Sequence, residues 1–222
     1  MAPTARPGGH ERSSWATIVP VAAAVGVFGV SYGVLATAAG VPAWEAVLMS
    51  ILVFAGSAQF AAVSSLAAGS PLGAVVSGVL LNSRYLATGA AAAGVLPGGR
   101  VRRFVLAQFV VDESFALGVS AGTPLRPDPR VLVTAGTAEW ACWVAGAAVG
   151  AVLGPVLGDP RRLGLDAAFP ALFVALLRPM LQRPRAARAA GAGLLAAAVL
   201  RPLVPPGVAL AGAAAAGLIA HR

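Results

Sequence analysis

The sequence predicts an all-α integral membrane protein, a polytopic helical bundle of about six full spans followed by a C-terminal Pro-broken helical hairpin. Its 222 residues are 58% hydrophobic and only 11% charged, which excludes an ordinary soluble domain. The charges are scattered singly, and all 16 basic residues are Arg. Uncharged runs separate Arg12 from Glu45 and Glu45 from Arg84, and each is long enough for at least one span of about 20 residues.

Pro and Gly residues divide the apolar sequence into segments. We expect full spans near residues 15–38, 44–67, 71–96, 104–122, 131–155 and 163–181. Two further segments, 187–201 and 206–220, are too short to cross a full-thickness bilayer, since about 15 helical residues rise only about 22 Å. Pro residues at the corner between them cannot donate the hydrogen bonds of a continuing helix. Whether this hairpin crosses the membrane or only enters it stays open.

We predict an N-terminal cytoplasmic tail over residues 1–14 and a single transmembrane domain over residues 15–222. Arg6 and Arg12 precede the first span and favour a cytoplasmic N-terminus, because basic residues accumulate on that side. The first apolar run is too long for a removed signal peptide.

Small residues recur at every fourth position within the expected spans. The pairs are Gly29 with Gly33, Gly69 with Gly73, and Gly118 with Gly122, and the ladder is Gly146, Gly150 and Gly154. This spacing favours close helix packing in lipid, and a specific dimer contact is the lesser alternative.

Four charged residues lie inside apolar spans: Arg84, Asp112, Glu113 and Glu139. Four unpaired charges there would cost roughly 10 kcal/mol, comparable with the net stability of a whole domain. They must therefore pair, become neutral or face water.

Two interpretations of Arg84 stay open, and they are compatible. The guanidinium forms a buried ion pair with Asp112 or Glu113, or it lines a cavity and holds a substrate carboxylate with its planar fork of donors. Asp112 shares a helical face with Gln108, so we expect Asp112 to point inward with Glu113 as its partner. A carboxyl group removed from water can bind and release a proton, which makes Asp112 and Glu113 candidates for proton coupling.

Two other acidic residues receive structural interpretations. Trp140 and Trp143 follow Glu139 and indicate an interfacial aromatic belt, which places Glu139 near the headgroups. Asp166 begins the sixth expected span, where an acidic group complements a helix N-terminus, and a cavity role is the alternative.

The segment from Phe54 to Phe60 combines a Gly, a hydroxyl and an amide in mid-span. A break in the helix there would expose backbone groups to a substrate, as in many transporters, whereas simple close packing is the alternative. Ser57 and Gln59 of this segment are candidate substrate-binding residues, together with Asn82, Arg84 and Tyr85.

Enzymatic and ATP-driven functions are excluded by what the sequence lacks. Two strings around Ser31 and Ser120 fit the G-x-S-x-G pattern, but His10 and His221 lie near the chain ends and cannot serve them as a base. A single Cys and two His exclude an all-protein zinc or iron–sulfur site, and the absence of Lys excludes a phosphate-binding loop. We expect no cofactor.

The residues taken in order resemble the AzlC-type branched-chain amino acid permease family, the large subunits of bacterial exporters. Five strings carry the resemblance: Phe28 to Gly33, Phe54 to Phe60, Asn82 to Tyr85, Asp112-Glu113, and Gly164 to Phe173. It implies export of hydrophobic amino acids such as valine or leucine across the bacterial inner membrane. It also implies an ion gradient as the driving force and a small hydrophobic AzlD-type partner subunit.

We therefore expect a transporter subunit in which Arg84 holds the substrate carboxylate. Ser57, Gln59 and Asn82 would orient the polar end, and Asp112 would sense the ammonium or carry the proton. The alternative is a structural or channel-like subunit whose buried charges only pair helices.

Overall fold

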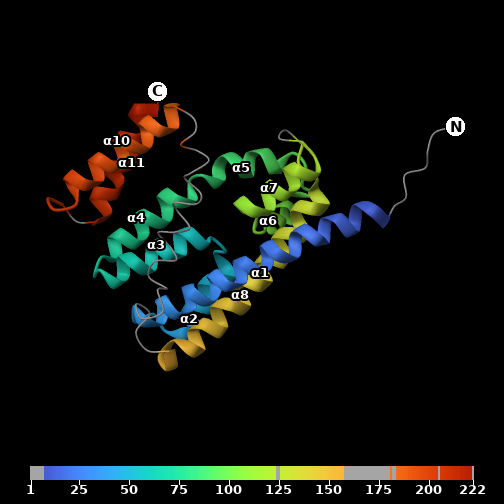
Figure 1. Cartoon of the computed structure of the whole chain (residues 1–222), viewed down its shortest axis with the longest axis horizontal. Helices are drawn as coiled ribbons and strands as arrows, with labels where there is room; N and C mark the ends of the chain where they lie inside the picture. The colour runs from blue at the N-terminus through green and yellow to red at the C-terminus, as the bar shows by residue number, and fades with distance from the viewer. Residues whose placement is uncertain (1–7, 124–125, 158–180, 182–183, 205, 222) are drawn as a thin grey trace.

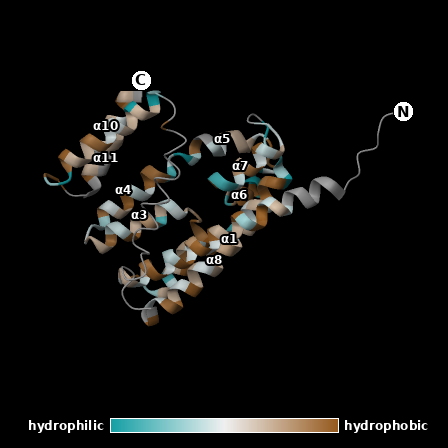
Figure 2. Cartoon of the chain, viewed as in Figure 1, coloured by the Kyte–Doolittle hydropathy of each residue, from teal (hydrophilic) through white to brown (hydrophobic). Residues whose placement is uncertain are grey.

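The computed structural model describes residues 8–123, 126–157, 181, 184–204 and 206–221. Regular structure in these ranges is helical, apart from an isolated β-bridge between Thr123 and Arg126. Many large apolar side chains face outward, including Phe104 and Val156, each 82% exposed, and hydrophobic residues cover the helices in Figure 2. Such exposure fits a lipid environment. The expected span 163–181, with Asp166, lies almost wholly outside the described residues.

Two long helices pack against each other along one side of the molecule (Figure 1): α1 (Gly8–Ala38) and α8 (Pro129–Leu157). Both contain a stretch that is long and apolar enough to cross a membrane, Trp15–Ala38 and Pro129–Gly154. The predicted spans 15–38 and 131–155 are therefore confirmed as continuous helices.

The glycine ladder explains how closely these two helices approach. A Cβ added at Gly146 or Gly150 would overlap the carbonyl oxygen of Gly26 or Val30 in α1, and one at Gly33 would overlap that of Ala147 in α8. The predicted packing role of these small residues is thus confirmed within the chain.

The pair Gly69 and Gly73 has a different role from the one predicted. Gly69 ends the turn after a helix with a φ of +72°, a backbone conformation that glycine adopts without strain. The amide of Gly73 donates to the Ser70 hydroxyl at the next helix start, 3.1 Å away. The four-residue spacing here reflects a turn and a cap instead of a contact between helices.

Three predicted spans are interrupted. Segment 44–67 divides into α2 (Ala43–Leu52) and α3 (Gly56–Ala67), and 71–96 into α4 (Pro71–Asn82) and α5 (Tyr85–Ala93). Segment 104–122 divides into α6 (Arg100–Ala107) and α7 (Asp112–Ala121), bent by 111°. By length and composition, two described helices could cross a membrane, or three if the bent pair counts as one span. The all-helical class is confirmed, but six continuous spans are not.

Side chains from distant segments stabilise the first break. Phe54 has a φ of +38°, which is strained for a residue with a side chain, and it is almost fully buried. The amide of Gln108 donates to the Leu52 carbonyl at 2.8 Å, and the Trp140 indole donates to that of Ile51 at 3.2 Å. These donors satisfy carbonyls that the end of α2 leaves without partners. Of the two alternatives for the segment from Phe54 to Phe60, the helix break is the one present, between Leu52 and Gly56.

The break between α6 and α7 contradicts the prediction that Gln108 and Asp112 share a helical face. Residues 108–111 leave the helix, and the Ser114 hydroxyl accepts from the Val111 amide at 3.0 Å and donates to the Phe109 carbonyl at 2.8 Å. Gln108 and Asp112 therefore do not share a helical face, because no continuous helix joins them. Gln108 instead reaches the end of α2.

The C-terminal hairpin is present as predicted, formed by α10 (Pro184–Leu200) and α11 (Pro206–His221). Its corner closes with amides of Leu203 and Val204 bonded to the Leu200 carbonyl, each at 3.0 Å. Gly217 lies against Ala189, and Gly193 against Ala213, so the two helices run antiparallel. α11 also contacts α4.

Candidate functional site

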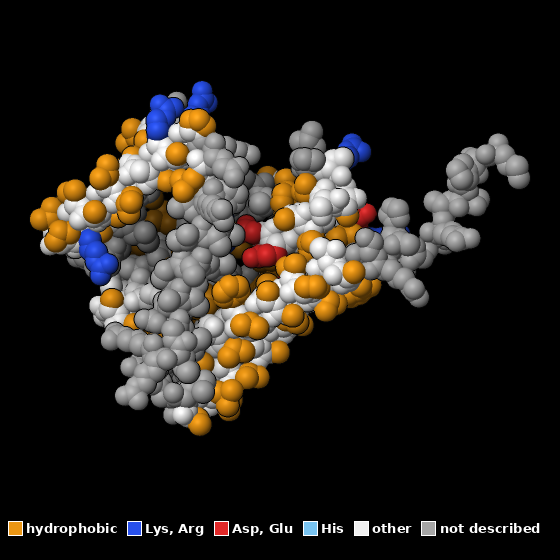
Figure 3. All heavy atoms as spheres, in the orientation of Figure 1, with side chains coloured by type: hydrophobic (Ala, Val, Ile, Leu, Met, Phe, Trp, Pro, Cys, Tyr) orange, Lys and Arg blue, Asp and Glu red, His pale blue; other side chains and the backbone are white. Residues whose placement is uncertain are grey.

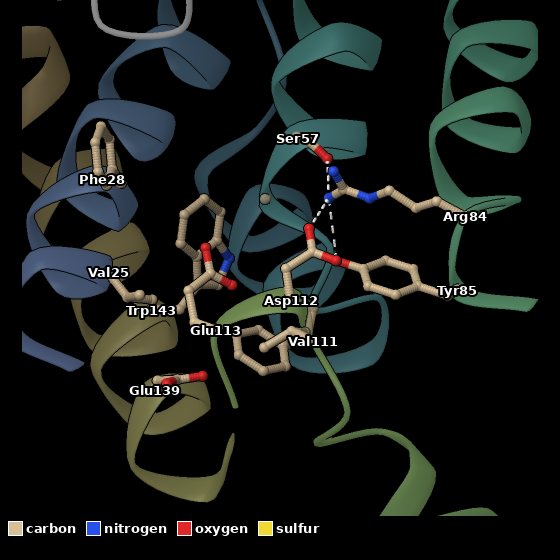
Figure 4. Close-up of a pocket in the computed structure, with 12 residues that line it drawn as sticks. Val25, Phe28, Ser57, Arg84, Tyr85, Val111, Asp112, Glu113, Glu139 and Trp143 are labelled. Carbon is tan, nitrogen blue, oxygen red and sulfur yellow. Dashed lines mark hydrogen bonds and ion pairs between the residues drawn. The ribbon is translucent and has the colours of Figure 1, made fainter. Parts of the chain in front are cut away.

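The three helix breaks meet at one cavity of about 60 Å³. Figure 4 shows side chains from the start of α3, the α4–α5 junction and the start of α7 converging there, opposite α1 and α8. The lining residues are Val25, Phe28, Phe54, Gly56, Ser57, Arg84, Tyr85, Val111, Asp112, Glu113, Glu139 and Trp143. A space of this size with polar side chains on one wall can hold a few water molecules.

Arg84 has hydrogen-bonding partners on three elements. Its Nη2 lies 2.9 Å from Asp112 Oδ2 and donates to Ser57 Oγ at 2.7 Å and to Tyr85 Oη at 3.3 Å. The Arg84 and Asp112 side chains are 33% and 30% exposed. Arg84 thus forms the predicted ion pair with Asp112 and also lines the cavity.

The first turns of α3 and α7 form part of the same wall of the cavity. Ser57 lies in the first turn of α3, whose N-cap residue Ala55 provides no side-chain cap, and Asp112 lies in the first turn of α7. Amides of a first helical turn have no partner within the helix, and the N-terminal end of a helix carries partial positive charge. With Arg84, these starts favour an anionic group.

Glu113 and Glu139 line the same cavity. Glu113 is half-buried, whereas Glu139 is fully buried and neither of its carboxylate oxygens has a hydrogen-bond partner. The prediction that Glu139 lies near the headgroups is wrong. Its neighbouring tryptophans turn toward the protein, because Trp143 bonds to Gln59 and Trp140 bonds to the end of α2.

Gln59 lies behind the cavity wall and is almost fully buried. Its Nε2 donates to Ser50 Oγ at 3.2 Å, and its Oε1 accepts from Trp143 Nε1 at 3.1 Å. Trp143 also stacks on Tyr32 with ring centroids 5.6 Å apart. Gln59 therefore fixes the orientation of an aromatic ring that does line the cavity.

Apolar side chains form the remaining walls. A Cβ added at Gly56 would lie 3.0 Å from Trp143 Cη2, so a larger residue there would press on the indole. Val25 and Phe28 project from α1 toward the same space in Figure 4.

The structure brings five of the seven predicted site residues to this cavity: Ser57, Arg84, Tyr85, Asp112 and Glu113. Gln59 lies one layer behind, and Asn82 ends α4 with its Oδ1 buried and unpartnered, outside the lining. Sequence reasoning missed Glu139 and Trp143 as cavity residues. The signal for Glu139 was present, since a charge within an apolar span indicates function. No group of three or more potential metal ligands occurs among the described residues.

Comparison with known proteins gives one family. The family model for the AzlC protein matches residues 20–157, more than half of the chain. The branched-chain amino acid transport protein AzlC of Bacillus subtilis is 29% identical over 167 residues, which cover 74% of this chain and 65% of that protein. This chain therefore spans slightly less than two thirds of that relative's length.

Two further relatives are uncharacterized membrane proteins. One from Archaeoglobus fulgidus is 32% identical over 78% of this chain and 84% of its own length. One from Haemophilus influenzae is 30% identical over 71% of this chain and 66% of its own length. No solved structure matches the chain.

Proposed function

The chain belongs to the AzlC family, a membrane transport family and not a family of enzymes, and we propose that it exports branched-chain or other hydrophobic amino acids. In this proposal it is the large subunit of a multi-pass exporter in the bacterial inner membrane. A proton gradient drives the export, and a small AzlD-type subunit completes the transporter.

One observation carries the assignment of substrate. A guanidinium with three polar partners lies where three broken helices meet, inside an otherwise apolar protein. Arg84 can form a two-pronged pair with the α-carboxylate of an amino acid. Ser57 and Tyr85 already contact Arg84 and would share in holding the carboxylate.

The remaining proposed residues orient the substrate or balance its charge. Asp112 senses the α-ammonium or carries the proton, with Glu113 as its neighbour. Gln59 acts through Trp143, and Asn82, at the end of α4 two residues before Arg84, has an unpartnered carbonyl oxygen available for the substrate. Phe28, Val25 and Trp143 provide the apolar surface that a branched side chain would contact.

Transport in proteoliposomes tests this role of Arg84. We expect Arg84→Ala to abolish flux of labelled leucine while the amount of membrane-inserted protein stays near the wild-type level. Arg84→Lys should recover little, because an ammonium group cannot form the two-pronged contact. Wild-type flux by Arg84→Ala would contradict the proposal.

The structural alternative is tested with both partners replaced. An ion pair that only joins helices can be exchanged for apolar groups with little loss of stability. The double variant Arg84→Leu/Asp112→Leu should therefore be stable on either view. It should be inactive if Arg84 binds substrate and active if the pair only joins α7 to the α4–α5 junction.

The partner is tested in cells. We expect efflux of labelled leucine to require both this chain and the neighbouring gene for a small membrane protein. Full efflux without that gene would remove the partner subunit from the proposal and leave the substrate assignment intact.

A further inference from the structure

Glu139 occupies the most enclosed position among the charged residues of the cavity. It lies within the long helix α8, is fully buried, and has no hydrogen-bond partner for either carboxylate oxygen. The Ser114 amide in the first turn of α7 approaches it without forming a hydrogen bond of standard geometry. An ionised carboxylate there would lack the partners that normally compensate for its removal from water.

The charges around the cavity do not balance. Among the described lining residues, Arg84 is the one basic side chain and Asp112, Glu113 and Glu139 are acidic. Asp112 is already paired with Arg84, and no second basic side chain of the described lining balances the two glutamates. In Figure 3, a group of acidic side chains lies near the middle of the visible face with no basic side chain visible next to it.

None of the described helices that pack against α8 adds a further basic side chain to the lining. Helices α1, α2 and α7 pack against α8. α1 contributes only Val25 and Phe28 to the lining, α2 contributes nothing, and Tyr85 is the other titratable lining group. Two carboxyl groups in one site with little water repel each other when both are ionised, and a single bound proton removes that repulsion.

We propose that Glu139 binds the coupling proton and that half-buried Glu113 exchanges it with water. This inference rests on the proposed function and places the proton on the wall opposite Arg84 and Asp112. The proton comes from hydronium in the water that reaches Glu113 and forms an O–H bond on one Glu139 oxygen, so no further reactant is needed. Opening of the cavity to water on the other side of the membrane reverses the step.

Chemical labelling tests the protonation site in the wild-type protein without any substrate. A hydrophobic carbodiimide reacts with protonated carboxyl groups in apolar surroundings, and peptide mass spectrometry locates the adduct. We expect an adduct on Glu139 that decreases as the pH rises. Labelling confined to Asp112 or Glu113 would overturn the proposal.

Transport by Glu139→Gln tests coupling, because glutamine has the size of the protonated carboxyl group but cannot release a proton. At one proton per substrate, a gradient of one pH unit supports about tenfold accumulation of leucine by the wild type. We expect Glu139→Gln to lose this accumulation completely while it still exchanges labelled for unlabelled leucine without a gradient. Glu45→Gln, at an exposed position at the start of α2, is the matched control and should accumulate leucine like the wild type.

The outcomes separate this proposal from the proposed function. Normal accumulation by Glu139→Gln would overturn it, as would loss of exchange together with accumulation in a variant that still elutes as folded protein. The second result would assign Glu139 to the ammonium group of the substrate. A wild type that moves no leucine would instead refute the proposed function, and the labelling experiment would then decide the proton site alone.

Discussion

Trp143 connects the interior of the protein with the cavity. Its indole N–H donates to Gln59, its ring stacks on Tyr32, and one edge lies over Gly56 at the start of α3. Phe60 packs edge-on against it with ring centroids 6.0 Å apart. A tryptophan held by a hydrogen bond and two aromatic rings presents a fixed apolar surface to the cavity.

Replacement of Gln59 by Met tests this positioning role. The side chain keeps its length, but the buried Trp143 N–H loses its acceptor, which costs about 1 to 3 kcal/mol. We expect a lower thermal midpoint in detergent and weaker binding of leucine. Ser120→Ala, at an exposed position in α7, is the control and should change neither quantity. Unaltered leucine binding by Gln59→Met would show that the indole needs no such support.

The three helix breaks must each satisfy the same physical requirement. Each break leaves backbone groups without helical partners. Gln108 and Trp140 from other segments satisfy some of them at the end of α2, and Ser114 of α7 itself does so at the start of that helix. Backbone polar groups tolerate a membrane interior only when they are satisfied in this way or line a cavity. All three breaks accordingly lie at the cavity, which residues of the helix starts line.

The contact between α1 and α8 gives a prediction for Gly150. Its Cβ would overlap the Val30 carbonyl, so Gly150→Ala should separate the helices and destabilise the protein by about 1 to 3 kcal/mol. Gly78→Ala in α4 is the matched control, because its Cβ would meet nothing within 4 Å. Thermal unfolding of the two variants in detergent measures the difference. Equal midpoints would mean that α1 and α8 do not need this close approach.

The outer surface identifies the environment of the whole molecule. Exposed apolar side chains are spread over both long helices and over the hairpin, for example Val27 at 67%, Val156 at 82% and Leu194 at 72%. In water such a surface would aggregate, whereas in lipid it costs nothing. Several polar side chains instead line the internal cavity, among them Arg84 and the three acids.

Because the hairpin is antiparallel, the start of α10 and the end of α11 lie at the same end of it. Gly217 lies against Ala189. The thiols introduced by Arg185→Cys and Ile219→Cys should therefore react with a membrane-impermeant reagent from the same side of the membrane. Both residues are exposed, and Cys142→Ala removes the native thiol. Reaction from opposite sides would refute the antiparallel arrangement.

The sequence by itself determined the helical membrane class, the positions of the spans 15–38 and 131–155, the C-terminal hairpin and the family. These depend on hydropathy over one segment and on short strings of residues, which are local properties. Ser57, Arg84, Tyr85 and Asp112 could be named in advance because polar groups in apolar spans are costly wherever they lie.

Only the tertiary structure decided that three breaks meet at one cavity, that Gln108 reaches the end of α2, and that Glu139 is enclosed beside Glu113. Each of these depends on contacts between residues far apart in the chain. A hydropathy pattern records how apolar a residue's neighbours are along the sequence. The pattern does not say which other helix packs against that residue. The packing decides whether a charge lies at the membrane surface or inside the protein.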